Sequence, residues 1–160
     1  MIFVCSSLPE GEVRFMTKPR GFEFLEHTAD IYIAAYGRDL AEAFENAALA
    51  MFETMTNIDD VKPRIKEFVE VEGEDKQALL YSWLEELLVR FEINGRLYSK
   101  FEVDEIKATD HGYKLKASIY GEPFDPSKHL QKVGVKAVTY HRMEIKETPK
   151  GVTLKFILDI

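Results

Sequence analysis

The feature that most constrains the fold is a change in hydrophobic period along the chain. Apolar residues recur at steps of three and four in segments 39–56 and 75–94, so each segment gathers them on one helical face. Segments 22–24, 31–36 and 64–72, and most of 101–158, have the composition or two-residue period of strands. Because strands flank two helices without regular βαβ alternation, we predict an α+β fold: a two-layer domain with a mixed, largely antiparallel sheet packed against two main helices.

Local signals mark the ends of these segments. Asp39 followed by Glu42 is a capping-box-like start for the first helix, and Gly95 suits the left-handed residue that follows the second helix. The C-terminal strands are expected at 101–109, 113–120, 133–146 and 152–158. Gly112 and Gly151 end turn sequences between them, which indicates hairpins.

The composition is that of one acidic domain. The chain has 160 residues, of which 46% are hydrophobic, and a formal net charge of −7. We assign residues 21–160 to a single domain, and residues 1–20, which show no sustained period, to a disordered or mis-assigned N-terminal extension. A negative net charge disfavours proteins that coat phosphate backbones, because that binding needs clustered Lys and Arg. Any contact with RNA is therefore expected to be indirect, through a protein partner.

Cysteine content and hydropathy bear on the compartment. Cys5 is the only cysteine, so an intrachain disulfide and a cysteine-cluster zinc site are excluded, and a reducing cytoplasm fits. No stretch approaches the roughly 20 apolar residues that a membrane-spanning helix needs. We expect a cytoplasmic protein without a membrane partner.

The first candidate site is His27-Thr28-Ala29-Asp30, at the entry to a strand. Carboxylate oxygen suits calcium, magnesium or manganese, whereas imidazole suits zinc or iron, so this pair does not choose a metal. The alternative is a turn in which Asp30 accepts hydrogen bonds from backbone amides and His27 is only partly buried. The residues alone leave both interpretations open.

The second candidate is Leu158-Asp159-Ile160, at the end of the last expected strand. Alternation places Leu158 on the apolar face, so Asp159 points to the other face. If this strand is docked, the Asp159 carboxylate and a main-chain or terminal oxygen of Ile160 offer ligands that calcium favours. The alternative is a mobile chain end whose charges are solvated.

Histidine also appears further along the chain. His141 shares an alternating face with Val135, Ala137, Met143 and Ile145, and a lone histidine on an apolar strand face is more often a core residue than a ligand.

The connection 121–129 contains two prolines and no period, and is expected to be an ordered surface loop. Its polar residues Glu122, Asp125 and His129 match no metal or catalytic spacing.

Several chemistries are absent from the sequence. It contains no glycine-rich phosphate cradle, no G-x-S-x-G nucleophile elbow and no H-E-x-x-H zinc motif. Nucleotide binding through a P-loop, serine-hydrolase chemistry and zincin-type proteolysis are therefore not indicated.

Taken together, several motifs resemble the archease family, in order from about residue 22 to residue 160. They are the HTAD segment at 27–30, the Asp39-Leu40 helix start, the helix ALLYSWLEELL at 78–88, Tyr120-Gly121-Glu122, Asp125-Pro126, His129, the strand VKAVTYH at 135–141, and the terminal Asp159-Ile160. Spread over that length, they are far more specific than any one motif.

The resemblance implies a function that composition does not show. Archeases are non-enzymatic activators of the RtcB-type tRNA-splicing ligase, whose guanylylation and multiple turnover they promote and whose nucleotide use they modulate. The resemblance also implies a bound divalent metal ion, most often calcium, with magnesium or manganese as alternatives. Its ligands would be Asp30, Asp159 and Ile160, with His27 and His141 as neighbours that orient them.

Two rival functions use the same residues differently. One is a small metal-dependent hydrolase, with His141 as the base, which would turn over substrate without a partner. The other is a chaperone or modulator of proteins that process DNA or RNA, which would need a large exposed apolar patch.

Overall fold

The computed structural model describes residues 21–25 and 29–160. The expected extension at 1–20 and His27 both lie outside the described residues. Within them the element order is β1 (Phe22–Leu25), β2 (Ile31–Gly37), α2 (Leu40–Met55), a 3-10 turn (Ile58–Asp60), β3 (Ile65–Gly73), α3 (Lys76–Asn94), β4 (Arg96–Thr109), β5 (Gly112–Pro123), β6 (Ala137–Thr148) and β7 (Gly151–Asp159).

The predicted α+β class is confirmed, and the strands divide between two sheets. One sheet has the order β1-β2-β7-β6 and the other β3-β5-β4, and all of these pairs are antiparallel. Both expected hairpins form: β4 pairs with β5, and β6 with β7. The last and the second strand, far apart in sequence, pair through seven residues of β2.

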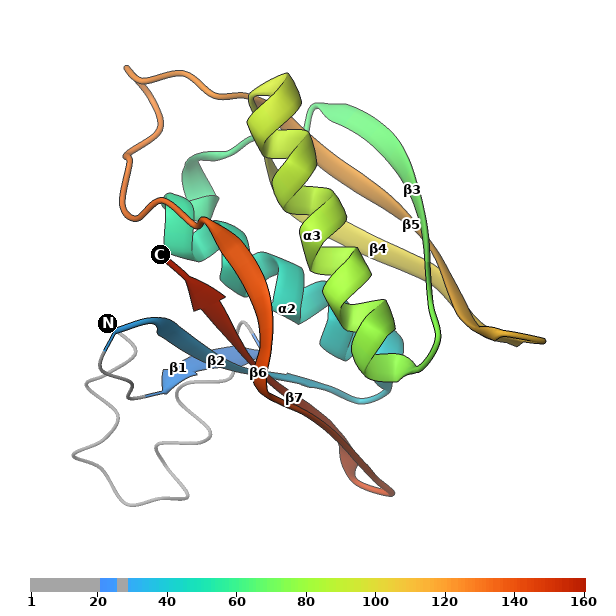
Figure 1. Ribbon diagram of the computed structural model, residues 1–160. Coiled ribbons are helices and arrows are strands. Elements are labelled where there is room, and N and C mark those ends of the chain that lie inside the picture. Colours follow the sequence, from blue (N-terminus) through green and yellow to red (C-terminus); the bar gives the residue numbers. More distant parts are fainter. Residues whose placement is uncertain (1–20, 26–28) are drawn as a thin grey trace.

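The helices lie between the two sheets (Figure 1). Helix α2 packs mainly on β2 and β4, while α3 packs mainly on β3 and β6, so each helix contacts both sheets. One apolar cluster runs through all the layers, and the indole N–H of Trp83 donates to the Phe44 carbonyl (2.9 Å), which joins α3 to α2. This shared core holds the two sheets in a fixed relation.

The predicted helix ends are also confirmed. The Asp39 side chain accepts a hydrogen bond from the Glu42 amide (2.9 Å), and Gly95 follows α3 with φ 65°, in the left-handed region that favours glycine. No described helix is long and apolar enough to cross a membrane.

Strand β6 departs from its predicted pattern in two ways. It begins at Ala137 rather than residue 133, because the preceding segment packs on the end of α2, where the Lys132 amide donates to the Met55 carbonyl (3.0 Å). A bulge then separates the pairs Thr139↔Ile157 and Glu144↔Lys155. The bulge breaks the alternation, so the prediction that His141 shares an apolar face is wrong: His141 and Ala137 are exposed.

Candidate functional site

The shared end of β2, β6 and β7 holds the predicted metal ligands. Ile31 of β2 lies opposite Leu158 of β7, and extending this register by one residue places Asp30 opposite Asp159. Residues that face each other in an antiparallel pair have Cα atoms about 4.5–5.5 Å apart and project to the same side. The fold therefore brings together the strand ends next to these two carboxylates, which are far apart in sequence.

Strand β6 holds the end of β7 from its other side. Ala137 pairs with Asp159, and the Lys136 amide donates to the Asp159 carbonyl (2.7 Å). Phe156 and Leu158 are fully buried and anchor the strand, whereas the Asp159 side chain is exposed and Ile160 is half-buried. The end of β7 is a docked strand, which the sequence alone had left open.

The donors at this end fit a hard cation. Asp30 and Asp159 supply carboxylate oxygens, and Ile160 adds a main-chain or terminal oxygen, a set that suits calcium better than zinc. No group of three His, Cys, Asp or Glu side chains that could hold a metal occurs in the described ranges 21–25 and 29–160. The remaining ligands of a cation would have to come from elsewhere, and the metal site stays a prediction.

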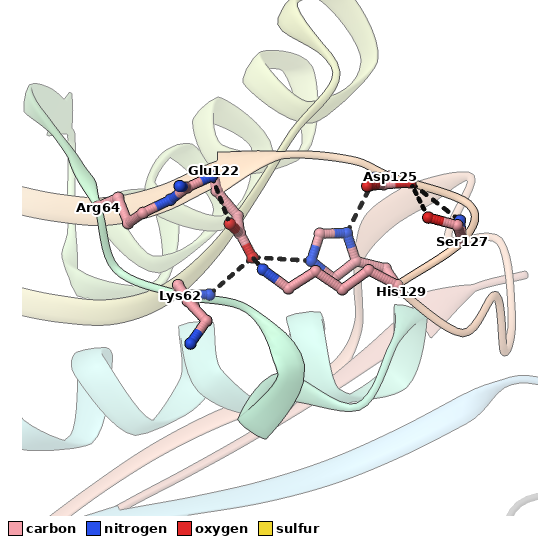
Figure 2. A network of polar contacts seen from close by, with 7 residues as sticks. Lys62, Arg64, Glu122, Asp125, Ser127 and His129 are labelled. Atoms are coloured by element: carbon pink, nitrogen blue, oxygen red, sulfur yellow. Dashed lines mark hydrogen bonds and ion pairs between the residues drawn. The ribbon is translucent and has the colours of Figure 1, made fainter.

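A second polar site, which the sequence reasoning missed, surrounds Glu122 (Figure 2). Glu122 and His129 are each only 1% exposed. One carboxylate oxygen of Glu122 accepts hydrogen bonds from the Lys62 amide (2.9 Å), Lys128 Nζ (2.7 Å) and His129 Nε2 (2.9 Å). Arg64 forms an ion pair with the other oxygen (3.1 Å). Both oxygens of this buried carboxylate have partners.

The hydrogen bonds define the protonation of His129. The Asp125 amide donates to His129 Nδ1 (2.9 Å), so Nδ1 is an acceptor and the ring proton lies on Nε2, where it donates to Glu122. Asp125 in turn accepts from the amide and the hydroxyl of Ser127 (2.9 and 2.7 Å). The imidazole thus links the loop backbone to the buried carboxylate.

Burial would raise the pKa of Glu122, but the hydrogen bonds from Lys128, the Lys62 amide and His129, with the charge of Lys128, lower it to about 2. Glu122 therefore stays ionised at neutral pH.

The Glu122 network fixes the path of the connection from β5 to β6. Residues 121–129 were expected to form a surface loop, and this holds for Asp125 to Lys128, but the structure buries both Glu122 and His129. Pro123 is the last residue of β5, and Pro126 lies in the turn that follows, where the Lys128 and His129 amides donate to the Asp125 carbonyl (2.9 and 2.7 Å). The sequence signal was the pairing of one Glu with one His across this Pro-containing turn, which no known metal spacing describes.

A third network joins α3 to the three-stranded sheet. Glu67 of β3 accepts hydrogen bonds from Arg90 (2.9 Å), Arg96 (2.6 Å) and the Tyr98 hydroxyl (3.0 Å). Burial followed by the bond to Glu67 raises the pKa of Tyr98. Because α3, β3 and β4 each contribute to it, we interpret this network as structural.

Comparison with known proteins now adds to the geometry. Residues 22–160 match the model of the archease protein family. The chain belongs to the archease family. Similar family members include the archease of Pyrococcus abyssi, 52% identical over 81% of this chain and 91% of the relative, and that of Sulfurisphaera tokodaii, 48% identical over 87% and 98%.

Two solved structures resemble the archease fold described above. A solution structure of a Methanobacterium thermoautotrophicum protein superposes with a TM-score of 0.76 at 42% identity, over 88% of this chain and 99% of that one. A crystal structure from Thermotoga maritima, described as an archease and possible chaperone, has a TM-score of 0.57 at 18% identity, over 85% and 94%. The second likeness supports the fold alone.

Proposed function

We propose that this protein is an accessory factor of an RtcB-type tRNA-splicing ligase, acting with a divalent cation held by Asp30, Asp159 and Ile160. The observation that supports the proposal is the β2–β7 register, which pairs Ile31 with Leu158 and, extended by one residue, would set Asp30 opposite Asp159 in a chain of the archease family. Neither carboxylate lies in a closed cleft of its own, since Asp159 is exposed and Asp30 is half-buried. That placement suits a site completed by a partner better than self-contained catalysis.

The cation would supply positive charge next to a phosphate group. The protein's own part is to hold two carboxylates at the ends of the two inner strands of a sheet, where β6 and β2 flank the end of β7. Calcium accepts six to eight oxygen ligands, more than these three residues provide, so water or groups of the ligase would complete the coordination. Magnesium and manganese fit the same oxygens.

The test is multiple-turnover RNA ligation by an RtcB-type ligase from a closely related source, with and without this protein. We expect the wild-type protein to raise ligase turnover and guanylylation, and Asp30→Asn and Asp159→Asn to abolish most of that gain. Asp110→Asn is the matched control, because Asp110 is an exposed carboxylate at the β4–β5 turn, in the other sheet.

Each outcome bears on a different part of the proposal. Absence of stimulation by the wild-type protein would overturn the ligase role, while normal stimulation by both Asn variants would overturn the site. Hydrolysis by the isolated protein would favour the hydrolase. Protection of unrelated aggregating proteins would favour the chaperone role that the description of the Thermotoga maritima structure names.

A further inference from the structure

A pair of stacked tyrosines lies where α3 meets β6. The rings of Tyr81 and Tyr140 have centroids 4.5 Å apart and planes within 5° of parallel. Tyr140 is nevertheless 53% exposed, although most large hydrophobic side chains of the described residues are buried. Tyr81 stacks on one face of the Tyr140 ring, yet more than half of Tyr140 remains exposed to solvent.

The β6 bulge accounts for the position of Tyr140. Between the pairs at Thr139 and Glu144 the strand carries extra residues, and Arg142 adopts φ 58°, which is uncommon for a residue other than glycine. The Arg142 guanidinium lies over the Tyr32 ring (5.3 Å) on β2. In a regular strand, successive side chains point alternately to the two faces of the sheet. The bulge breaks this alternation, and the Tyr140 ring points toward α3.

Nearby carboxylates act on the stacked pair. Partial burial and the negative charges of Asp75, Glu85 and Glu74 raise the pKa of Tyr140, and a hydrogen bond to Glu85 raises the pKa of Tyr81. The neighbouring cation Lys76 forms an ion pair with Glu147. The surface thus combines a half-exposed aromatic ring with three carboxylates whose negative charges act on it. We call Glu74, Asp75, Tyr81, Glu85 and Tyr140 the tyrosine–carboxylate surface.

We propose that the tyrosine–carboxylate surface receives an arginine-bearing segment of the protein partner. A guanidinium group stacks flat on an aromatic face and donates to carboxylates from its edge, whereas an ammonium group offers only a point charge. An RNA phosphate would be repelled by the same carboxylates. The proposal rests on the proposed function, because the partner meant is the ligase.

The position of this surface adds to the argument. Tyr140 lies three residues along β6 from Ala137, which pairs with Asp159. Three residues of chain span at most about 11 Å, so the backbone of Tyr140 lies close to the strand end that carries Asp159. A partner contact here would hold the ligase beside the Asp30 and Asp159 carboxylates.

The first experiment measures the affinity of the full-length protein for the ligase by biolayer interferometry. We expect Tyr140→Ala and Glu85→Arg to weaken binding about fivefold to tenfold, and Tyr140→Phe, which keeps the ring, to bind like the wild type. Glu92→Arg is the matched control, because Glu92 is an exposed carboxylate two turns further along α3. Equal losses for Glu85→Arg and Glu92→Arg would overturn the proposal. Thermal melts check that each variant is folded.

The second experiment separates this inference from the proposed function. The blocked peptide Gly-Arg-Gly-Arg-Gly and its lysine counterpart are titrated into the labelled protein, and the Tyr81 and Tyr140 ring resonances are followed by NMR. We expect the arginine peptide to shift these resonances at a several-fold lower concentration than the lysine peptide. Equal shifts from the lysine peptide, or larger shifts from a short RNA, would overturn the proposal even if the ligase binds. If the ligase fails to bind, the proposed function falls and the peptides still decide whether guanidinium is recognised.

Discussion

Glu122 and Asp159 are both carboxylates near the ends of strands, yet their surroundings are opposite. Glu122 is buried and accepts hydrogen bonds or ion pairs from four residues, Lys62, Arg64, Lys128 and His129. The Asp159 side chain is exposed, and among the described residues only its main-chain oxygen is seen to accept a bond. A carboxylate whose bonds are completed inside the fold serves stability, whereas an exposed one at a rigid strand end remains available to a ligand.

The two regions are also connected. The Glu122 network holds residues 125–129, and the chain then runs past α2 to Lys136, whose amide bonds to Asp159. The buried carboxylate thus helps to place the strand that flanks the exposed one. The following predictions test whether stability and ligand binding divide between them as the geometry indicates.

The largest expected effect is that of Glu122→Gln on stability. The variant leaves two cations and a histidine without their buried anion, so we expect a loss of about 3 kcal/mol in the free energy of unfolding, measured by urea denaturation. Asp159→Asn is the control and should leave the unfolding midpoint unchanged. Equal losses for both variants would show that the division between the two regions is wrong.

The pH dependence of stability should report the same carboxylate. The pKa of Glu122 is about 2 in the folded protein against an ordinary value of 4.5, so its ionised form stabilises the fold. That contribution is complete above about pH 4.5 and is lost as the pH falls towards 2. Urea midpoints should fall over this window and fall less steeply in Glu122→Gln. Parallel curves for the two proteins would contradict the assignment.

Calcium affinity tests the exposed region. The Asp159→Asn variant lacks one charged ligand. Its affinity for calcium, measured by isothermal titration calorimetry, should be at least about tenfold weaker than that of the wild type. Glu122→Gln, measured where it is folded, should change the affinity far less, because Glu122 contacts no predicted ligand. A loss confined to Glu122→Gln would place the cation in the buried network instead.

The smallest expected effect is that of Lys128→Met. Lys128 donates one of several bonds to Glu122 and is partly exposed, so its loss should cost about 1 kcal/mol in unfolding free energy. Lys100→Met, which removes an exposed ion pair with Glu102, is the comparison and should have little effect. If the two lysines prove equivalent, the Glu122 network is looser than its distances indicate.

Most of the fold could be predicted from the sequence, and the exceptions have a common cause. Helices α2 and α3, their caps at Asp39 and Gly95, and both C-terminal hairpins follow from periods and turn residues within a few positions of each other. His141 was assigned to the wrong face because the β6 bulge leaves no signal in the local period. The buried role of Glu122 was missed because its partners come from residues 62–64 as well as 128–129.

For the candidate site the division is similar. The sequence by itself determined that Asp30 enters a strand, that Asp159 ends one on its polar face, and that both belong to an archease pattern. Only the tertiary structure decided that β2 and β7 pair in the register that opposes them, that β6 holds the end of β7, and that Tyr140 reaches Tyr81. Local propensity acts over a few neighbouring residues, whereas strand pairing and burial depend on contacts between distant segments, which for β2 and β7 lie more than a hundred residues apart.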